Sequence, residues 1–310
     1  MTRQWSFIFG RGPGTDYPCR SISLETQNKR HAVNSSTQSQ IMIDDQVLPS
    51  AHLLQQQARK DAVFKVLGVR INAVQIPDVV AQMCGWISDG KECHFIAVTG
   101  MHGVSEAQHD SAFKQILNSA DLVVPDGMPL VWLGRHHGYD LKRRVYGPEL
   151  MLTFCRATGS KYRHFFWGGM NGVAECLAQG LAQQFGINVV GTYSPPFRPF
   201  STEEDHEALA VIHEAKPDIL WIGLSTPKQE HWMYLHRPKL RVPAIVGVGA
   251  AFDLNSGRTV QAPTWMREHG LECVFRLLQE PRRLWRRYLL HGSKFVWNVS
   301  LELLSLRTFE

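Results

Sequence analysis

The 310-residue sequence has no apolar run of the roughly 18 residues that a membrane-spanning helix needs. The apolar stretch near its N-terminus is too short for a signal peptide. Six cysteines are present, but none forms a C-x-x-C pair, and the fourteen histidines include no H-E-x-x-H. We therefore expect a cytoplasmic protein with free thiols and with neither a metal site nor a bound cofactor.

Excess charge is confined to one short segment. The formal net charge is +5, and residues 276–294 contain six cationic side chains against one acidic one, so the rest of the chain is neutral overall. Such a segment attracts phosphates, whether on nucleic acid, on anionic lipid or on a substrate.

The chain divides into three parts by composition. Residues 1–62 are rich in serine and glutamine around positions 35–57, which predicts a disordered polar leader. From residue 63 to 270 short apolar strands alternate with helical patterns, which predicts an α/β, Rossmann-like domain with a largely parallel sheet flanked by helices. We expect paired strands around Gly68 and one amphipathic helix over residues 105–120. Residues 271–310 are predicted to form a basic amphipathic appendage.

Ligands of parallel sheets bind beyond the carboxyl ends of the strands, so the loops there are the first places to search. Asp126 directly follows an apolar strand in Val-Val-Pro-Asp126-Gly127, where a carboxylate can act as a general base or simply form an Asp-Gly turn. The loop Gly168-Gly169-Met-Asn171-Gly could approach a phosphate or be a plain tight turn. Arg144 can pair with a carboxylate or a phosphate.

In this order and spacing the motifs resemble the WecG/TagA/CpsF glycosyltransferases, glycosyltransferase family 26, from about residue 66 to 290. The stretches that carry the resemblance are 120–127, 144–150, 223–230, 247–253 with Ser256-Gly257, 262–266, 270–272 and 276–288. It implies an inverting, metal-independent enzyme that moves a sugar from a UDP-sugar to a polyprenyl-diphosphate-linked saccharide in bacterial surface or exopolysaccharide synthesis. Met101, Glu149 and Cys273 depart from many members, so the donor could be N-acetylmannosamine or a related hexose or uronic acid.

The resemblance also assigns roles to residues of this chain. The family's base falls on Asp126, and its active-site threonine, arginine and glutamine fall on Thr99, Arg144 and Gln229. Further substrate contacts are expected at Gly127, Gly168, Gly169, Asn171, Lys228, Arg276, Arg283 and Arg286. The family's C-terminal segment closes the active site and docks on the membrane, and self-association would be in keeping with the family.

The residues fit such chemistry on physical grounds. UDP departs with growing negative charge, and the Asp-x-Asp motif that holds a divalent ion in many sugar transferases is absent. Preorganised arginines and backbone N–H groups can stabilise that charge instead. Aromatic and apolar residues among the C-terminal arginines suit an anionic membrane surface at the inner face of the cell membrane: Trp285, Tyr288, Leu289, Phe295 and Trp297. The other interpretation is a helix packed on the core with a solvated basic face.

Two other functional classes remain open. A nucleotide-binding oxidoreductase would use Gly247-Val-Gly249 after a strand and Glu272 for a ribose, although Phe252 replaces the third glycine. A non-catalytic membrane adaptor could keep the same fold. Nucleic-acid binding fits the basic charge but not the acidic loop chemistry.

Overall fold

The computed structural model describes residues 62–196, 198, 201–285, 289 and 292–309. The leader predicted for residues 1–62 lies outside the described residues, apart from Ala62. The described chain opens with β1 (Val63–Val66), which pairs antiparallel with β2 (Val69–Asn72). Leu67 and Gly68 join them with φ angles of 51° and 78°, a two-residue turn whose positive φ values match the twist of a hairpin. The paired strands predicted around Gly68 are confirmed.

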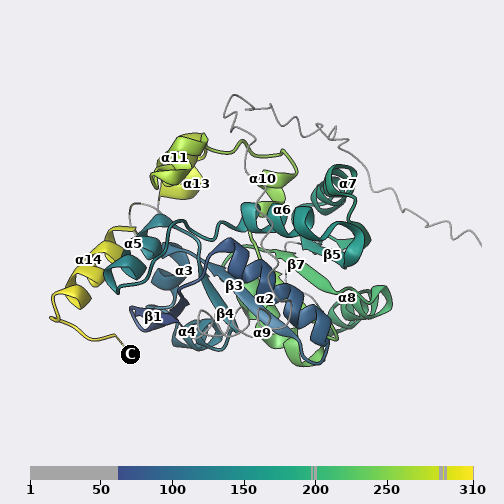
Figure 1. The fold of residues 1–310 in the computed structure, drawn as a ribbon, viewed down its shortest axis with the longest axis horizontal. Helices are drawn as coiled ribbons and strands as arrows, with labels where there is room; N and C mark the ends of the chain where they lie inside the picture. The colour runs from purple at the N-terminus through teal and green to yellow at the C-terminus, as the bar shows by residue number, and fades with distance from the viewer. Residues whose placement is uncertain (1–61, 197, 199–200, 286–288, 290–291, 310) are drawn as a thin grey trace, which may run out of the picture.

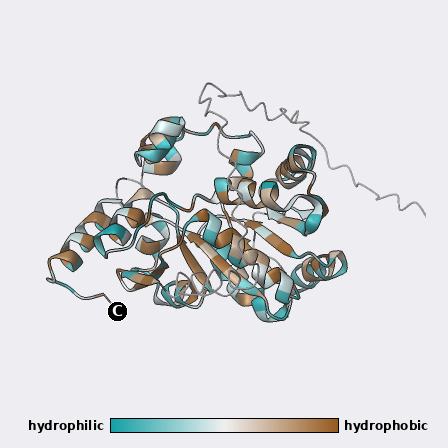
Figure 2. Cartoon of the chain, in the orientation of Figure 1, coloured by the Kyte–Doolittle hydropathy of each residue, from teal (hydrophilic) through white to brown (hydrophobic). Residues whose placement is uncertain are grey.

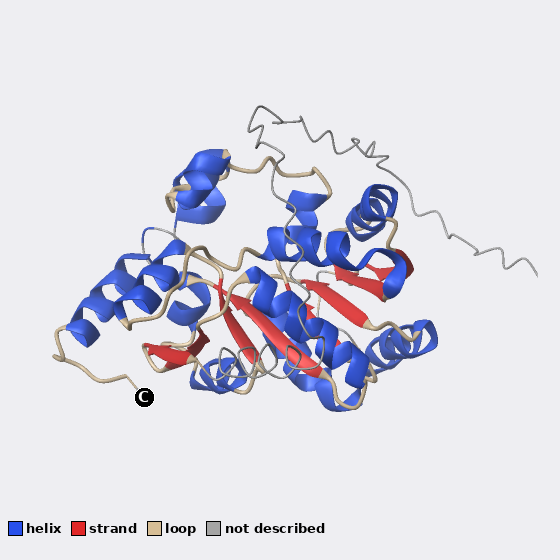
Figure 3. Cartoon of the chain, in the orientation of Figure 1, coloured by secondary structure: helices blue, strands red, loops and turns tan. Residues whose placement is uncertain are grey.

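A six-stranded sheet in the order β4-β3-β8-β7-β5-β6 crosses the molecule, and each neighbouring pair of strands is parallel (Figures 1 and 3). Its strands are β3 (His94–Thr99), β4 (Leu122–Pro125), β5 (Arg163–Gly168), β6 (Asn188–Tyr193), β7 (Ile219–Gly223) and β8 (Ala244–Gly247). Five of them are almost wholly buried, and they are among the most apolar parts of Figure 2. The predicted α/β fold with a parallel sheet is confirmed.

Helices cover both faces of this sheet because successive side chains of each strand point to opposite sides. Phe95 and Ala97 of β3 belong to one hydrophobic cluster, while Ile96 and Val98 belong to the other. Residues of the first cluster also come from α3 (Met101–Glu106), α4 (Ser111–Asn118), α5 (Met128–His136), α8 (Thr202–Ala215), α9 (Lys228–His236) and α14 (Gly292–Leu303). The second cluster draws on α2 (Ile76–Asp89), α6 (Gly147–Thr158), α7 (Val173–Phe185) and α10 (Ala251–Asn255).

The single helix predicted over residues 105–120 is wrong, because two helices, α3 and α4, occupy this region. The side chain of Asp110 accepts a hydrogen bond from Phe113 N at 2.9 Å and starts α4 as an N-cap. Apolar residues keep helical spacing across the break, so the hydrophobic pattern of the sequence does not reveal that the helix is interrupted. Helix α3 begins earlier than expected, at Met101, directly after β3.

The described residues of the C-terminal segment include three short helices and one longer one. Helices α11 (Thr264–Glu268), α12 (Glu272–Gln279) and α13 (Pro281–Trp285) precede α14, and α11 and α13 stand above the sheet edge in Figure 1. Phe295 and Val299 of α14 are buried in the first cluster, and Glu302 accepts hydrogen bonds from Leu67 N at 3.0 and 3.1 Å. Phe295 was expected to face the membrane, and this is wrong because its ring completes the core. None of the helices in the described part of the chain is long and apolar enough to span a membrane.

Candidate functional site

Thr99 and Asp126 lie side by side because β3 and β4 are parallel and end together. Thr99 is opposite Pro125 in the register, and Asp126 N donates a hydrogen bond to Thr99 O at 2.9 Å. A Cβ atom at Gly100 would lie only 2.6 Å from Asp126 O, so a side chain there would force the two strand ends apart. The sheet therefore brings the predicted base and the predicted threonine together at its carboxyl edge.

The hydroxyl of Thr99 is a buried polar group without a protein acceptor or donor among the described residues. Thr99 is 1% exposed, and its Oγ1 makes no hydrogen bond there. Its methyl group faces Gly103, where an added Cβ would approach Thr99 Cγ2 to 2.9 Å. A buried hydroxyl without a partner is costly in a purely structural role and is typical of a functional site.

Gln229 lies at the start of α9, against the carboxyl end of β8. A Cβ at Gly247 would meet Gln229 Nε2 at 3.0 Å, and one at Gly249 would meet Gln229 Oε1 at 3.5 Å. Gln229 Nε2 donates to Glu230 Oε1 at 3.0 Å, and Thr226 Oγ1 donates to the same oxygen at 2.7 Å. Gln229 Oε1 is buried and accepts no hydrogen bond from any described residue. Glu230 thus orients Gln229, and this role was not predicted because no local sequence pattern marks the glutamate. Lys228, which was predicted to contact the substrate, is exposed.

Arg144 is held in a loop that is anchored beside Asp126. Val145 N donates to Pro125 O at 2.8 Å, which fixes the loop to the end of β4. Arg144 Nη2 donates to Glu272 Oε2, and Tyr146 Oη donates to Glu272 Oε1 at 3.0 Å. The guanidinium also lies over the Tyr146 ring, 4.0 Å from its centroid. The buried Glu272 begins α12, so this cluster connects the C-terminal segment to the strand-end loops.

The charges of this cluster act on one another. Burial by itself lowers the pKa of Arg144, but the negative charges of Asp126 and Glu272 outweigh it and raise that pKa above its ordinary value. Burial, followed by the charges of Glu272 and Asp126, raises the pKa of Tyr146, which therefore remains a neutral donor. Asp126 thus lies within the electrostatic field of Arg144, a cation beside the carboxylate to which the resemblance assigns the role of general base.

The glycine-rich loop after β5 has a clear packing role. A Cβ at Gly168 would lie 2.6 Å from Gly223 O, and Gly168 has a φ of 131°. Gly169 has a φ of 74°, and its N–H donates to Gly223 O at 3.0 Å. That N–H is therefore engaged within the sheet edge, which favours the tight turn over the phosphate-binding loop at this position. Asn171 is exposed at the tip of the loop.

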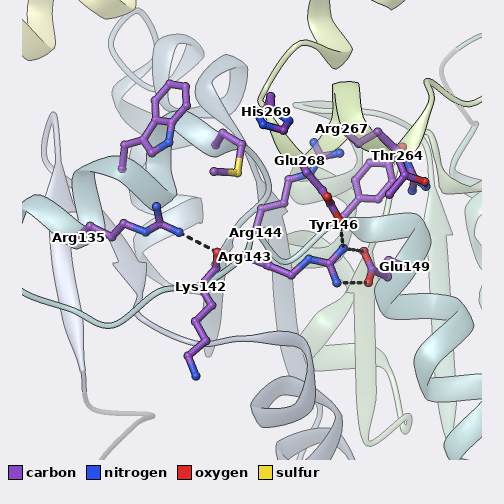
Figure 4. A pocket seen from close by; sticks show the side chains of 12 residues that line it. Arg135, Lys142, Arg143, Arg144, Tyr146, Glu149, Thr264, Arg267, Glu268 and His269 are labelled. Carbon is purple, nitrogen blue, oxygen red and sulfur yellow. Dashed lines mark hydrogen bonds and ion pairs between the residues drawn. The ribbon is translucent and has the colours of Figure 1, made fainter. Parts of the chain in front are cut away.

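A pocket of ≈ 500 Å³ lies beside Arg144, and five of the twelve side chains that line it are arginine or lysine (Figure 4). It is lined by Met128, Trp132, Arg135, Lys142, Arg143, Arg144, Tyr146, Glu149, Thr264, Arg267, Glu268 and His269. Among these residues, Glu149 was noted in the sequence only as a departure from the family pattern, and Arg144 alone was predicted to contact a substrate. Arg143 is its neighbour in a basic triplet and could have been noticed, but Arg267 is distant in the chain and carries no local signal.

Of the three C-terminal arginines predicted to contact the substrate, the structure describes the side chain of Arg276 alone. Arg276 lies in α12, partly buried, and does not line the pocket. Arg283 falls within α13, and Arg286 lies outside the described residues, so their expected substrate contacts stay predictions. In the described part of the chain, no group of three or more His, Cys, Asp or Glu residues could hold a metal ion.

Comparison with known proteins identifies relatives along most of the chain. Residues 64–308 match the model of the "Glycosyl transferase WecG/TagA/CpsF family". A relative from Bacillus spizizenii is 31% identical over 186 residues, which cover 59% of this chain and 70% of the relative. Relatives from Bacillus subtilis and Staphylococcus aureus are 27% and 26% identical, covering 64% and 62% of this chain and 76% and 74% of their own lengths. All three bear the name N-acetylglucosaminyldiphosphoundecaprenol N-acetyl-beta-D-mannosaminyltransferase.

Proposed function

The chain belongs to the WecG/TagA/CpsF family of glycosyltransferases, and on this basis we propose that it transfers a sugar from a UDP-sugar to a polyprenyl-diphosphate-linked saccharide. The family assignment overturns the oxidoreductase alternative. Glu272, which that alternative reserved for a ribose, is the first residue of a helix and pairs with Arg144 and Tyr146. Gly249 is followed after one residue by a helix of only five residues, α10.

One observation carries the proposed mechanism: Asp126 stands beside Thr99 at the carboxyl edge of the sheet and within the field of Arg144. The hydroxyl oxygen of the acceptor attacks the anomeric carbon of the donor, and the Asp126 carboxylate accepts the proton of that hydroxyl. The bond from that carbon to UDP breaks from the opposite side, which inverts the configuration. Arg144 and the cations near it offset the charge that develops on the departing diphosphate, without a metal ion.

The substrates of the relatives make N-acetylmannosamine the first donor to test and an N-acetylglucosamine-diphosphate lipid the first acceptor. Gln229 would hydrogen-bond the donor through Oε1, and Thr99 through its hydroxyl, which is supported by the burial of both atoms without a partner among the described residues. The enzyme would work at the inner face of the cell membrane, where a nucleotide sugar and a polyprenyl lipid can meet, in the synthesis of a surface polysaccharide.

Purified protein, a panel of UDP-sugars and a short-chain polyprenyl-diphosphate N-acetylglucosamine test this proposal. We expect release of UDP with one donor, unaffected by EDTA, and a fall in kcat of about 10²–10⁴-fold in Asp126→Asn, because a general base contributes that much. Asp89→Asn is the matched control, since Asp89 is exposed at the end of α2 and forms an ion pair with the exposed Lys91. Full activity of Asp126→Asn would disprove the assignment of the base, and donor binding without turnover by the wild type would favour the adaptor.

A further inference from the structure

The cationic pocket beside Arg144 holds more positive charge than its own carboxylates neutralise. Its wall contains two carboxylates, Glu149 and Glu268, and five cationic side chains, namely Arg135, Lys142, Arg143, Arg144 and Arg267. We propose that this pocket binds the diphosphate of the lipid-linked acceptor, an inference that rests on the proposed function and extends it to a specific subsite.

The five cations are not equally committed to protein partners. Arg135 donates to the carbonyls of Leu141 and Lys142 at 2.6 and 2.7 Å, and Arg144 pairs with Glu272, so both are held by the fold. Lys142 has no carboxylate within ion-pair distance among the residues that the structure describes. Arg267 makes no ion pair among the described residues: its Nη2 donates to the hydroxyl of Thr264 at 3.1 Å, and its buried Nε donates to no described acceptor.

Arg143 is paired in a way that an incoming anion can replace. It contacts Glu149 at 3.1 Å and Glu268 at 3.6 Å, with its side chain 59% exposed (Figure 4). Exposed ion pairs contribute little stability, so exchanging a carboxylate for a phosphate costs little. Guanidinium groups bind phosphate oxygens with paired hydrogen bonds, and a lysine adds a point charge. The pocket thus offers three adaptable cations, Lys142, Arg143 and Arg267, to a doubly charged group.

The surroundings of the pocket favour a lipid diphosphate over a nucleotide diphosphate. Trp132 lines the pocket while 50% exposed, and Trp265 of α11 is 59% exposed. A Cβ at Gly270 would touch Trp132 at 3.4 Å, so the turn after α11 lies against this indole, and the exposed Leu271 follows. An isoprenoid chain that leaves the diphosphate would cover these apolar groups, whereas UDP has no apolar tail to do so.

The position of the pocket relative to Asp126 fits an acceptor. Arg144 lines the pocket, and the negative charge of Asp126 acts on its guanidinium. Met128, two residues after Asp126, also lines the pocket. A diphosphate in the pocket would place the attached sugar next to the carboxylate that must take its proton. A volume of ≈ 500 Å³ exceeds that of a single phosphate and lies within the usual range for ligand sites.

Titration calorimetry with farnesyl diphosphate and, separately, with UDP tests the proposal without requiring turnover. In Lys142→Gln/Arg143→Gln we expect farnesyl diphosphate to bind at least about tenfold more weakly, because two charge-assisted contacts are lost, while UDP binding stays unchanged. Lys239→Gln/Arg241→Gln is the control that removes the same charge. Both residues are exposed and precede β8, so they lie near the amino ends of the parallel strands, and we expect both affinities to stay unchanged. Equal melting temperatures of the three proteins would show that the fold is intact.

The other outcomes of the binding experiment overturn the proposal. Weakened UDP binding with unchanged farnesyl diphosphate binding would make the pocket the donor's diphosphate site. Unchanged binding of both ligands, or an equal loss in the control variant, would show that the pocket is no specific anion site. If farnesyl diphosphate binding depends on Lys142 and Arg143 but no UDP-sugar is turned over, the subsite stands and the proposed transfer fails.

Discussion

Glu272 is the residue that joins the C-terminal segment to the catalytic edge of the sheet. Its two carboxylate oxygens accept from Arg144 and from Tyr146, 128 and 126 positions away in the sequence. An anion buried beside a guanidinium orients it, and removing one partner of such a pair leaves the other uncompensated. Glu272 is therefore a positioning residue that acts on Asp126 through Arg144.

This role predicts a change in the pH dependence of the reaction. In Glu272→Gln the guanidinium of Arg144 loses one of its two nearby carboxylates, so Asp126 keeps its negative charge more readily. We expect the acidic limb of the kcat/KM profile to move to lower pH, and kcat to fall by about tenfold because the base is weaker.

Glu214→Gln supplies the control for this variant, because Glu214 is an exposed carboxylate on α8 that does not line the pocket. Its profile should match that of the wild type. An acidic limb that stays in place in Glu272→Gln would show that Glu272 only holds α12 against the core.

At the level of elements, the break between α3 and α4 determines where the residues after Thr99 lie. Helix α3 starts directly after β3 and contributes Gly103, which packs against Thr99. A continuous helix over residues 105–120 would have left residues 100–104 as a loop. The break depends on Asp110, whose carboxylate binds Phe113 N and also lies 4.0 Å from His231 Nε2.

The capping role of Asp110 can be separated from its charge. Asp110→Ala should lower the free energy of unfolding by about 1 kcal/mol in urea denaturation, the usual cost of removing an N-cap. Asp110→Asn keeps an acceptor oxygen and loses the charge, so it should retain most of that stability. If both variants were equally destabilised, the contact with His231 rather than the cap would be responsible.

At the scale of the whole molecule, α14 presents two different faces. Phe295 and Val299 are buried with the hydrophobic cluster, whereas Val296 is exposed and Trp297 is 66% exposed. The helix therefore packs on the core, as the second interpretation of this segment expected, and membrane docking stays a prediction that its exposed apolar side chains make testable. An exposed tryptophan beside apolar neighbours suits the headgroup region of a bilayer.

A paired substitution on the exposed face tests membrane docking without disturbing the core. Val296→Ser/Trp297→Ser should weaken binding to anionic lipid vesicles several-fold in a flotation assay, with the melting temperature unchanged, because less apolar area is buried in the bilayer. Val211→Ser, on the exposed side of α8 beside β6, should have no effect. Phe295→Ala, by contrast, should cost about 3 kcal/mol of stability, as expected for a buried aromatic. Vesicle binding that survives the double substitution would place the docking surface elsewhere.

Whereas the family resemblance pointed to Thr99 and Gln229, local patterns alone determined the alternation of strands and helices, the hairpin around Gly68 and the placing of Asp126 at a strand end. These features follow from hydrophobic periodicity and turn chemistry within short windows, and the parallel sheet then brings its carboxyl ends to one edge. Tertiary structure decided what those residues contact. The pairing of Arg144 with Glu272, the orientation of Gln229 by Glu230, the inward turn of Phe295 and the meeting of Arg143 with Arg267 in one pocket depend on how distant segments return to the sheet. Such contacts form between groups that no local pattern relates, so they become visible only when the chain is folded.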